Sequence, residues 1–171
     1  MIEINFNKEE LDACRKGANL RYQFARNSDL DKSQNYASDP ERQEGSALDY
    51  LGIRGELAVA KAFDLHFDPF RGMGVDNGID LFWNDVSIDV KATPYLNGKL
   101  LFRSLNKFKS EIAVLTIEVE EGLFRVPGWI KREDFVKNSG PFLNGVAVTQ
   151  EDLNPPEELW QIMTNKKNMK I

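Results

Sequence analysis

The stretch that decides the fold of this 171-residue chain is Gly78-Ile-Asp-Leu-Phe-Trp-Asn-Asp-Val-Ser-Ile-Asp-Val-Lys-Ala-Thr93. Two apolar runs flank its central Asn-Asp dipeptide, a turn-forming pair, so the pattern predicts a β-hairpin. With that dipeptide as the loop, the expected cross-strand pairs are Trp83 with Val86, Leu81 with Ile88, and Asp80 with Asp89.

Side chains alternate along a strand, so this register sorts the hairpin into two faces. The apolar face, which we expect to meet the core, holds Ile79, Leu81, Trp83, Val86, Ile88 and Val90. The other face sets Asp80 against Asp89, with Cβ atoms roughly 4.5–5.5 Å apart, and adds Lys91. Facing carboxylates repel, and a divalent cation with a preference for hard oxygen ligands, such as Mg²⁺, would offset that repulsion.

Two other interpretations of the hairpin stay open. The aspartates are ordinary polar positions on the solvent side of an antiparallel sheet, screened by Lys91. Alternatively, a slip of one residue sends one aspartate to the opposite face. Asp76, in the glycine-rich segment 71–78, competes with Asp80 for the role of first aspartate, but Asp80 is the one that falls opposite Asp89 in the simple hairpin.

Asp80, followed nine positions later by Asp89-Val90-Lys91, resembles the signature of the PD-(D/E)XK nucleases, with Ile79 in place of the usual proline. Upstream, residues 51–63 form an amphipathic helical pattern that resembles the first core helix of that family, and Glu56 lies at the margin of its apolar stripe. The resemblance covers roughly residues 48–135. It implies an α/β restriction-endonuclease-like core, with a central mixed β-sheet flanked by helices and an extra N-terminal helix.

The resemblance also implies a chemistry, the metal-assisted hydrolysis of a phosphodiester. Mg²⁺, with Mn²⁺ as a substitute, would be bound by Asp80, Asp89, the Val90 carbonyl and Glu56. Lys91 would orient or deprotonate the attacking water. The alternative for Glu56 is a solvated helix glutamate. A basic segment that follows the hairpin is expected to track the DNA backbone, although ordinary surface residues are an equal alternative; its members are Lys99, Arg103, Lys107 and Lys109.

The expected function is therefore that of a Mg²⁺-dependent deoxyribonuclease that cleaves DNA, as an endonuclease. One alternative is a catalytically inactive nuclease-like domain that serves as a DNA- or protein-binding module. Another is a small protein unrelated to nucleic acid, whose acidic hairpin is merely solvated. Endonucleases of this kind are commonly dimers, so the resemblance leaves room for a homodimer.

Composition limits the other classes of protein. A hydrophobic content of 42 % and a charged content of 29 % are those of an ordinary globular domain. The net charge of −5 argues against a protein that coats nucleic acid through overall charge. Cys14 and His66 are the only residues of their kinds, which excludes an internal disulfide, a cysteine-based zinc site and a histidine-rich metal site.

We expect one domain over residues 1–171, with its core at about 46–137 and a C-terminal extension at 138–171. Residues 7–45 should hold a helix and a polar loop: Asn7 and Glu10 form a capping pattern, and residues 27–45 are rich in Asp, Ser, Asn and Gln. The helix carries basic side chains that could meet a DNA backbone, although a solvated surface is favoured; these are Arg15, Lys16, Arg21 and Arg26.

Downstream, apolar runs predict strands at 112–119 and 123–130, and Pro127 indicates an edge or a bulge in the second. The segment 128–135 resembles the passage from strand to short helix near the end of such nuclease domains. Pro156 should begin a last helix. No apolar run approaches the length of a membrane span, and the N-terminus lacks the pattern of a signal peptide, so a cytoplasmic protein is expected.

Overall fold

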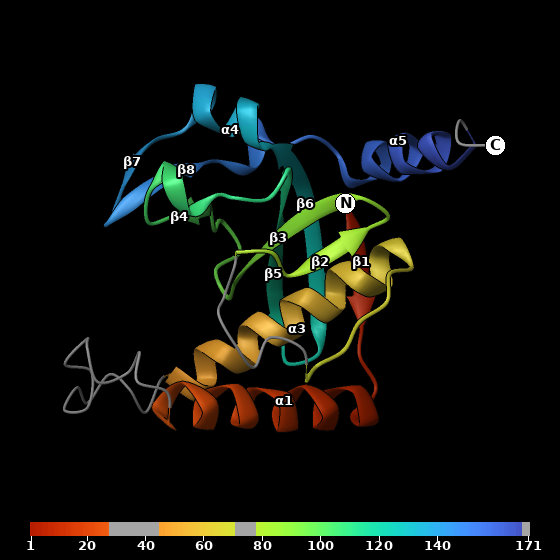
Figure 1. The fold of residues 1–171 in the computed structure, drawn as a ribbon, viewed down its shortest axis with the longest axis vertical. Helices are drawn as coiled ribbons and strands as arrows, with labels where there is room; N and C mark the ends of the chain where they lie inside the picture. Colours follow the sequence, from red (N-terminus) through yellow and green to blue (C-terminus); the bar gives the residue numbers. More distant parts are fainter. Residues whose placement is uncertain (28–44, 71–77, 169–171) are drawn as a thin grey trace.

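The computed structural model describes residues 1–27, 45–70 and 78–168 (Figure 1). Two features of the sequence lie outside these ranges. They are nearly all of the polar segment expected at 27–45, and the glycine-rich segment with Asp76.

The hairpin forms in the register that its sequence predicts. Strand β2 (Leu81–Trp83) pairs antiparallel with β3 (Val86–Thr93), and Leu81 lies opposite Ile88. Asn84, at the tip, adopts a φ of 52°, a left-handed conformation that asparagine tolerates better than most residues. Asp80 precedes β2, but its N–H still donates to the Ile88 carbonyl at 2.9 Å. The apolar face predicted for the hairpin is the face that enters the core.

The hairpin is one edge of a mixed five-stranded sheet with the order β1-β6-β5-β3-β2 (Figure 1). The other strands are β1 (Ile2–Asn5), β5 (Ile112–Glu120) and β6 (Leu123–Lys131). Only β3 and β5 run parallel within this sheet, and parallel neighbours need a long crossover, which residues 94–111 provide. The mixed sheet and both predicted strands are confirmed; the short strand β1 was not predicted.

Pro127 lies at a bulge, one of the two positions that the sequence allows for it. Leu115 pairs with Gly128 and Ile117 pairs with Arg125, so two residues of β6 face one residue of β5 between these pairs. Proline has no N–H to give to the ladder, and the bulge is where an interior strand can spare one.

Helix α3 (Gly45–Phe63) packs across one face of the sheet, and α1 (Lys8–Asn27) packs on α3 rather than on the sheet (Figure 1). The capping pattern of α1 is confirmed, since the Glu10 N–H donates to Asn7 Oδ1 at 2.9 Å and the Asn7 N–H donates to Glu10 Oε2 at 2.8 Å. Helix α4 (Arg132–Asn138) follows β6 directly, and α5 (Pro156–Asn168) begins at the expected proline.

The opposite face of the sheet is covered by a second sheet that the sequence did not predict. Its three strands have the order β4-β8-β7, and they are β4 (Leu100–Phe102), β8 (Gly145–Val148) and β7 (Gly140–Phe142). Short 3-10 turns follow β4 at Leu105–Lys107 and β8 at Gln150–Asp152. Part of the segment expected to be an extension, residues 140–148, therefore completes a layer of the fold.

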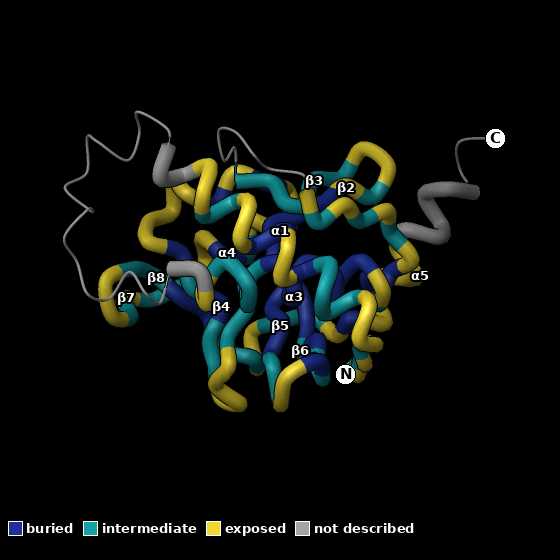
Figure 2. Tube along the Cα trace, turned by 90° about the horizontal axis from the view of Figure 1, so that it is seen from below, coloured by how far each residue is buried: buried dark blue, intermediate teal, exposed yellow. Residues whose placement is uncertain are grey.

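Buried residues form clusters on both faces of the central sheet, and the most buried segments run through α3, β5 and β6 (Figure 2). On the second-sheet side, the rings of Phe102, Phe108 and Phe135 pack together. A smaller cluster joins α1 to α3 and contains Cys14, whose burial raises the pKa of its thiol to about 12. In the described part of the chain we find no helix with the length and apolarity that a lipid bilayer would require.

Candidate active site

Asp89 and Lys91 point from β3 toward the second sheet, away from the face covered by α3. Asp89 is only 1 % exposed, and its carboxylate accepts a hydrogen bond from the Lys91 ammonium. The same ammonium lies 4.7 Å from the centre of the Phe102 ring on β4, a distance at which a cation is attracted to the ring face. The lysine is therefore held between a buried carboxylate and an aromatic ring.

Asp80 lies beside Val90, but the paired ladder ends at Leu81, so the expected pair of Asp80 with Asp89 is not part of it. Its Oδ2 accepts a hydrogen bond of 2.6 Å from the N–H of Val90, the residue between Asp89 and Lys91. The pKa of Asp80 is raised to about 7, mainly by burial and also by the neighbouring charges of Glu56 and Asp89. The Val90 N–H and the Lys91 ammonium lower the pKa, but by less. A carboxyl group that titrates near neutral pH marks a candidate functional site.

Glu56 reaches this site from α3, far away in the sequence. It is 7 % exposed, and its two carboxylate oxygens accept hydrogen bonds from the two terminal nitrogens of Arg21, at 2.7 and 2.8 Å. The solvated alternative for Glu56 is therefore wrong. Its effect on the pKa of Asp80 shows that it belongs to the same electrostatic cluster.

Gly55 explains how α3 comes close enough to deliver Glu56. A Cβ at Gly55 would lie 2.7 Å from the Ala92 Cβ of β3 and 2.8 Å from the Thr116 Oγ1 of β5. Only a residue without a side chain lets the helix backbone approach the sheet to this distance. The next residue, Glu56, is thereby fixed at the edge of the helix–sheet contact.

Three of the four side chains that the sequence singles out for catalysis, Asp80, Asp89 and Lys91, lie near one another on the hairpin, and the fourth, Glu56, acts on Asp80 through its charge. The donor set is chemically suited to Mg²⁺, because it consists of buried carboxylate oxygens. Their present partners are protein groups, and within the described residues no three acidic, histidine or cysteine side chains are arranged to bind one ion. Val90 enters the site through its N–H, so the role expected for its carbonyl stays a prediction.

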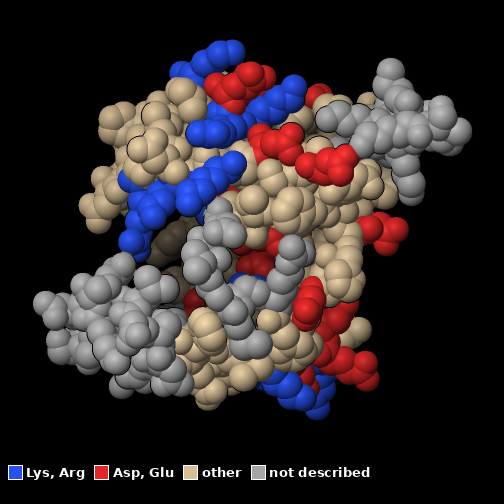
Figure 3. Space-filling model, in the orientation of Figure 1, with Lys and Arg blue, Asp and Glu red and all other residues tan. Residues whose placement is uncertain are grey.

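The basic segment after β3 lies on both sides of β4 along the chain. Figure 3 shows Lys and Arg side chains gathered over the β4 region, with acidic groups visible in the depth of a hollow beside them. Arg103, Lys107 and Lys109 are exposed. The chain at Lys107 and Lys109 runs about 4 Å from the position of a Cβ on Gly78, two residues before Asp80. Lys99 directly precedes β4, and its ammonium lies 4.4 Å from the centre of the Phe142 ring.

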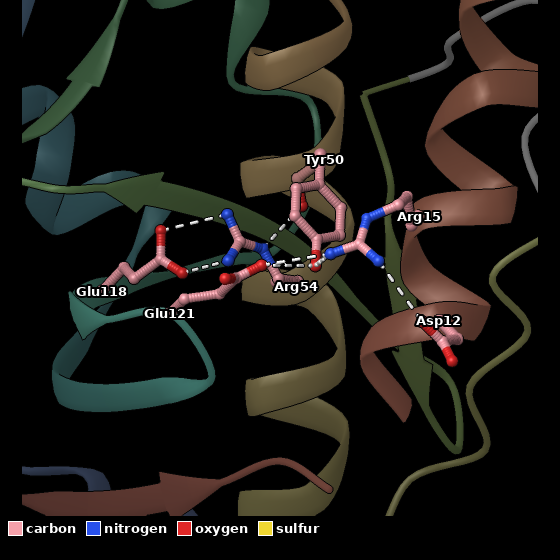
Figure 4. A network of polar contacts seen from close by, with 6 residues as sticks. All are labelled: Asp12, Arg15, Tyr50, Arg54, Glu118 and Glu121. Carbon is pink, nitrogen blue, oxygen red and sulfur yellow. Dashed lines mark hydrogen bonds and ion pairs between the residues drawn. The ribbon is translucent and has the colours of Figure 1, made fainter. Parts of the chain in front are cut away.

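A second network of charges ties α1 and α3 to the sheet at another point (Figure 4). The Arg54 guanidinium lies 3.8 Å from the Tyr50 ring centre and binds both carboxylate oxygens of Glu118 on β5. Arg15 binds Asp12 and Glu121, each at 3.3 Å. These contacts lie between the helices and the β5–β6 turn, so we interpret this network as structural.

Arg21 is the member of the site that the sequence analysis missed, because it was grouped with the basic residues on the surface of α1. Its position gave a signal: Arg21 follows Cys14 by seven residues and Ala18 by three, so it lies near the buried stripe of the helix. Asp49 was missed as well. Burial and Glu56 raise the pKa of Asp49, while Arg21 lowers it, which places it in the same cluster.

His66, the single histidine, is exposed.

Comparisons of the chain with family models, with characterised proteins and with solved structures returned no match. The functional argument therefore rests on the side chains of the site.

Proposed function

We propose that this protein is a Mg²⁺-dependent deoxyribonuclease with a restriction-endonuclease-like core, and that it cleaves DNA as an endonuclease. The observation that supports the proposal is that Asp80, Asp89 and Lys91 lie near one another on the hairpin, with the charge of Glu56 from α3 acting on Asp80. Three acidic groups gathered in a partly buried place cost stability, and ordinary packing gives no reason for them.

Each residue has a role in this proposal. The carboxylates of Glu56, Asp80 and Asp89, with the Val90 carbonyl, would hold Mg²⁺. The bound ion would make water more acidic and offset the charge that develops on the phosphate. Lys91, fixed by Asp89 and by the Phe102 ring, would donate a hydrogen bond from Nζ that orients the attacking water.

Charge balance supports the same assignment. When all are ionised, the four carboxylates of the cluster, Asp49 included, face the two cationic groups of Arg21 and Lys91, which leaves two net negative charges. A divalent ion would offset these two charges. The exposed basic residues at 103, 107 and 109 would hold the flanking phosphates.

One observation favours a second candidate, a nuclease-like domain that binds DNA or another protein without cleaving it. Each of the three carboxylates already has a protein donor: Arg21 for Glu56, the Val90 N–H for Asp80, and Lys91 for Asp89. In that case these contacts would be permanent and the site would serve only to hold the fold together.

Cleavage assays separate the two candidates. Supercoiled, linear, single-stranded and branched DNA would be incubated with the protein and Mg²⁺ or Mn²⁺. We expect cleavage that falls at least about 100-fold in Asp89→Asn and in Lys91→Met. The matched controls are Asp134→Asn and Lys137→Met, which alter an exposed Asp–Lys pair on α4 and should leave cleavage unchanged. DNA binding with no cleavage of any substrate supports the binding module instead.

A further inference from the structure

The contact between Arg21 and Glu56 has a geometry that matters for the proposed metal site. Both oxygens of Glu56 are taken by the two terminal nitrogens of one guanidinium, at 2.7 and 2.8 Å. The pair is largely buried, with side-chain exposures of 22 % for Arg21 and 9 % for Glu56. A metal ion that used Glu56 as a ligand would need at least one of these oxygens.

Arg21 also differs from the other arginine that forms a buried pair. The Arg54 guanidinium binds one carboxylate, that of Glu118, and rests on the Tyr50 ring. The Arg21 guanidinium interacts with Glu56 and lies in the electrostatic field of Asp80 and Asp49 as well. A single positive group thus binds one carboxylate and is attracted to two more.

We propose, on the basis of the metal site above, that Arg21 is an exchange residue: its guanidinium takes the place of the ion beside Glu56 in the metal-free protein, and the ion binds by replacing it. Without a cation, the buried carboxylates would repel one another. Arg21 offsets that repulsion from α1, an element outside the hairpin and α3 that supply the ligands. It acts through Glu56, so it is a positioning residue and not a catalytic one.

The proposal sets an order of metal affinities. Arg21→Gln removes the competitor, and Mn²⁺ should bind about tenfold more tightly or better, because hydrogen bonds between charged groups are the strong ones. Arg21→Lys keeps the charge but cannot bind both oxygens in parallel. Its affinity should lie severalfold above that of the unaltered protein and below that of Arg21→Gln.

The lysine variant distinguishes exchange from a simple effect of charge. If Arg21 acted only through its distant positive charge, Arg21→Lys would bind Mn²⁺ as weakly as the unaltered protein. If Arg21 held Glu56 ready for the ion, both variants would bind Mn²⁺ more weakly. Either result overturns the proposal.

The measurement is the electron paramagnetic resonance signal of free Mn²⁺ during titration of the full chain, with Mg²⁺ as a competitor. Arg15→Gln and Arg15→Lys are the matched controls, since Arg15 lies on the same helix and pairs with Asp12 and Glu121 instead. Their affinities should stay within about twofold of that of the unaltered protein. Circular dichroism verifies that each variant folds.

A second readout needs no substitution and covers the case in which Arg21→Gln fails to fold. In the unaltered protein, Mg²⁺ should shift the side-chain Nε–Hε resonance of Arg21 while that of Arg15 stays in place. An Arg21 resonance that does not move at saturating Mg²⁺ overturns the exchange.

Failure of the exchange can be told apart from failure of the proposed function. If the unaltered protein binds Mn²⁺ and cleaves DNA, and both are lost in Asp89→Asn, the metal site stands whatever Arg21 does. The order of the Arg21 variants then decides the exchange alone. A protein that binds no Mn²⁺ overturns both.

Discussion

Asp80 has a chemistry that departs far from that of a free side chain. Its carboxyl group is buried near two other acidic groups, and its pKa rises to about 7. The folded protein therefore holds a proton on Asp80 at pH values where the unfolded chain has released it. Proton binding by Asp80 therefore stabilises the folded protein fully below the ordinary pKa of about 3.9. This stabilisation is lost as the pH rises through 7.

Asp80→Asn cannot ionise, so we expect it to gain stability relative to the unaltered protein as the pH rises from 4 to 8. Between pH 4 and pH 8, the difference in unfolding free energy between Asp80→Asn and the unaltered protein should change by on the order of 3 kcal/mol. Urea unfolding at a series of pH values, with a chelator present, measures it.

Asp152 provides a control of opposite sign. Hydrogen bonds from the Thr149 side chain and backbone lower its pKa, so its contribution to stability is lost as the pH falls. Asp152→Asn should therefore have a lower free energy of unfolding than the unaltered protein at high pH. Equal pH profiles for Asp80→Asn and the unaltered protein would contradict the assignment of a raised pKa to Asp80.

At the scale of elements, the packing of α3 on the sheet decides where Glu56 stands. Two glycines of this helix, Gly52 and Gly55, have different surroundings: a Cβ at Gly52 meets no atom within 4 Å, whereas one at Gly55 would collide with Ala92 and Thr116. The two positions thus allow a test in which the same chemical change has opposite effects.

Gly55→Ala should destabilise the protein by about 1–3 kcal/mol, because the helix must move off the sheet. Gly52→Ala should stabilise it by roughly 0.5–1 kcal/mol, since alanine is the better helix former. Thermal unfolding measures both. Gly55→Ala should also lower the proposed cleavage activity by displacing Glu56, and a stabilised Gly55→Ala variant would show that the close approach is not required.

At the scale of the whole molecule, the charge is unevenly distributed. The net charge is −5, yet exposed basic residues follow β3, and Figure 3 shows Lys and Arg side chains gathered over the β4 region. Under the proposed function, DNA would bind across this region. Each phosphate contact releases counterions and makes the affinity dependent on salt.

Arg103→Gln and Lys107→Gln should each weaken DNA binding for all sequences and reduce the slope of log affinity against log salt concentration by about 1. Fluorescence anisotropy at several salt concentrations, without divalent ions, measures the slope. Arg125→Gln, which breaks an exposed pair with Glu3 on the β1–β6 side of the sheet, is the control and should leave the slope unchanged. Equal slopes for all three variants would place the DNA elsewhere.

An element could be predicted where residues close together in the sequence determine its structure. The hairpin register followed from Asn84-Asp85 and the alternation around it, and the capping of α1 followed from Asn7 and Glu10. Strand β1 and the second sheet were missed. Their strands are only three or four residues long, and short strands form through partners that are distant in sequence.

By itself, the sequence determined which residues could share a face of one element. The spacing of Asp80 and Asp89 across a two-residue loop did so for the hairpin, and the apolar stripe placed Glu56 at its margin for the helix. Tertiary structure alone decided that Glu56 comes within electrostatic reach of Asp80, and that Arg21 from α1 pairs with Glu56. The physical reason is that periodicity orients a side chain about its own helix or strand. The distance between two elements depends on how closely their backbones pack, which here is set by Gly55 against β3 and β5.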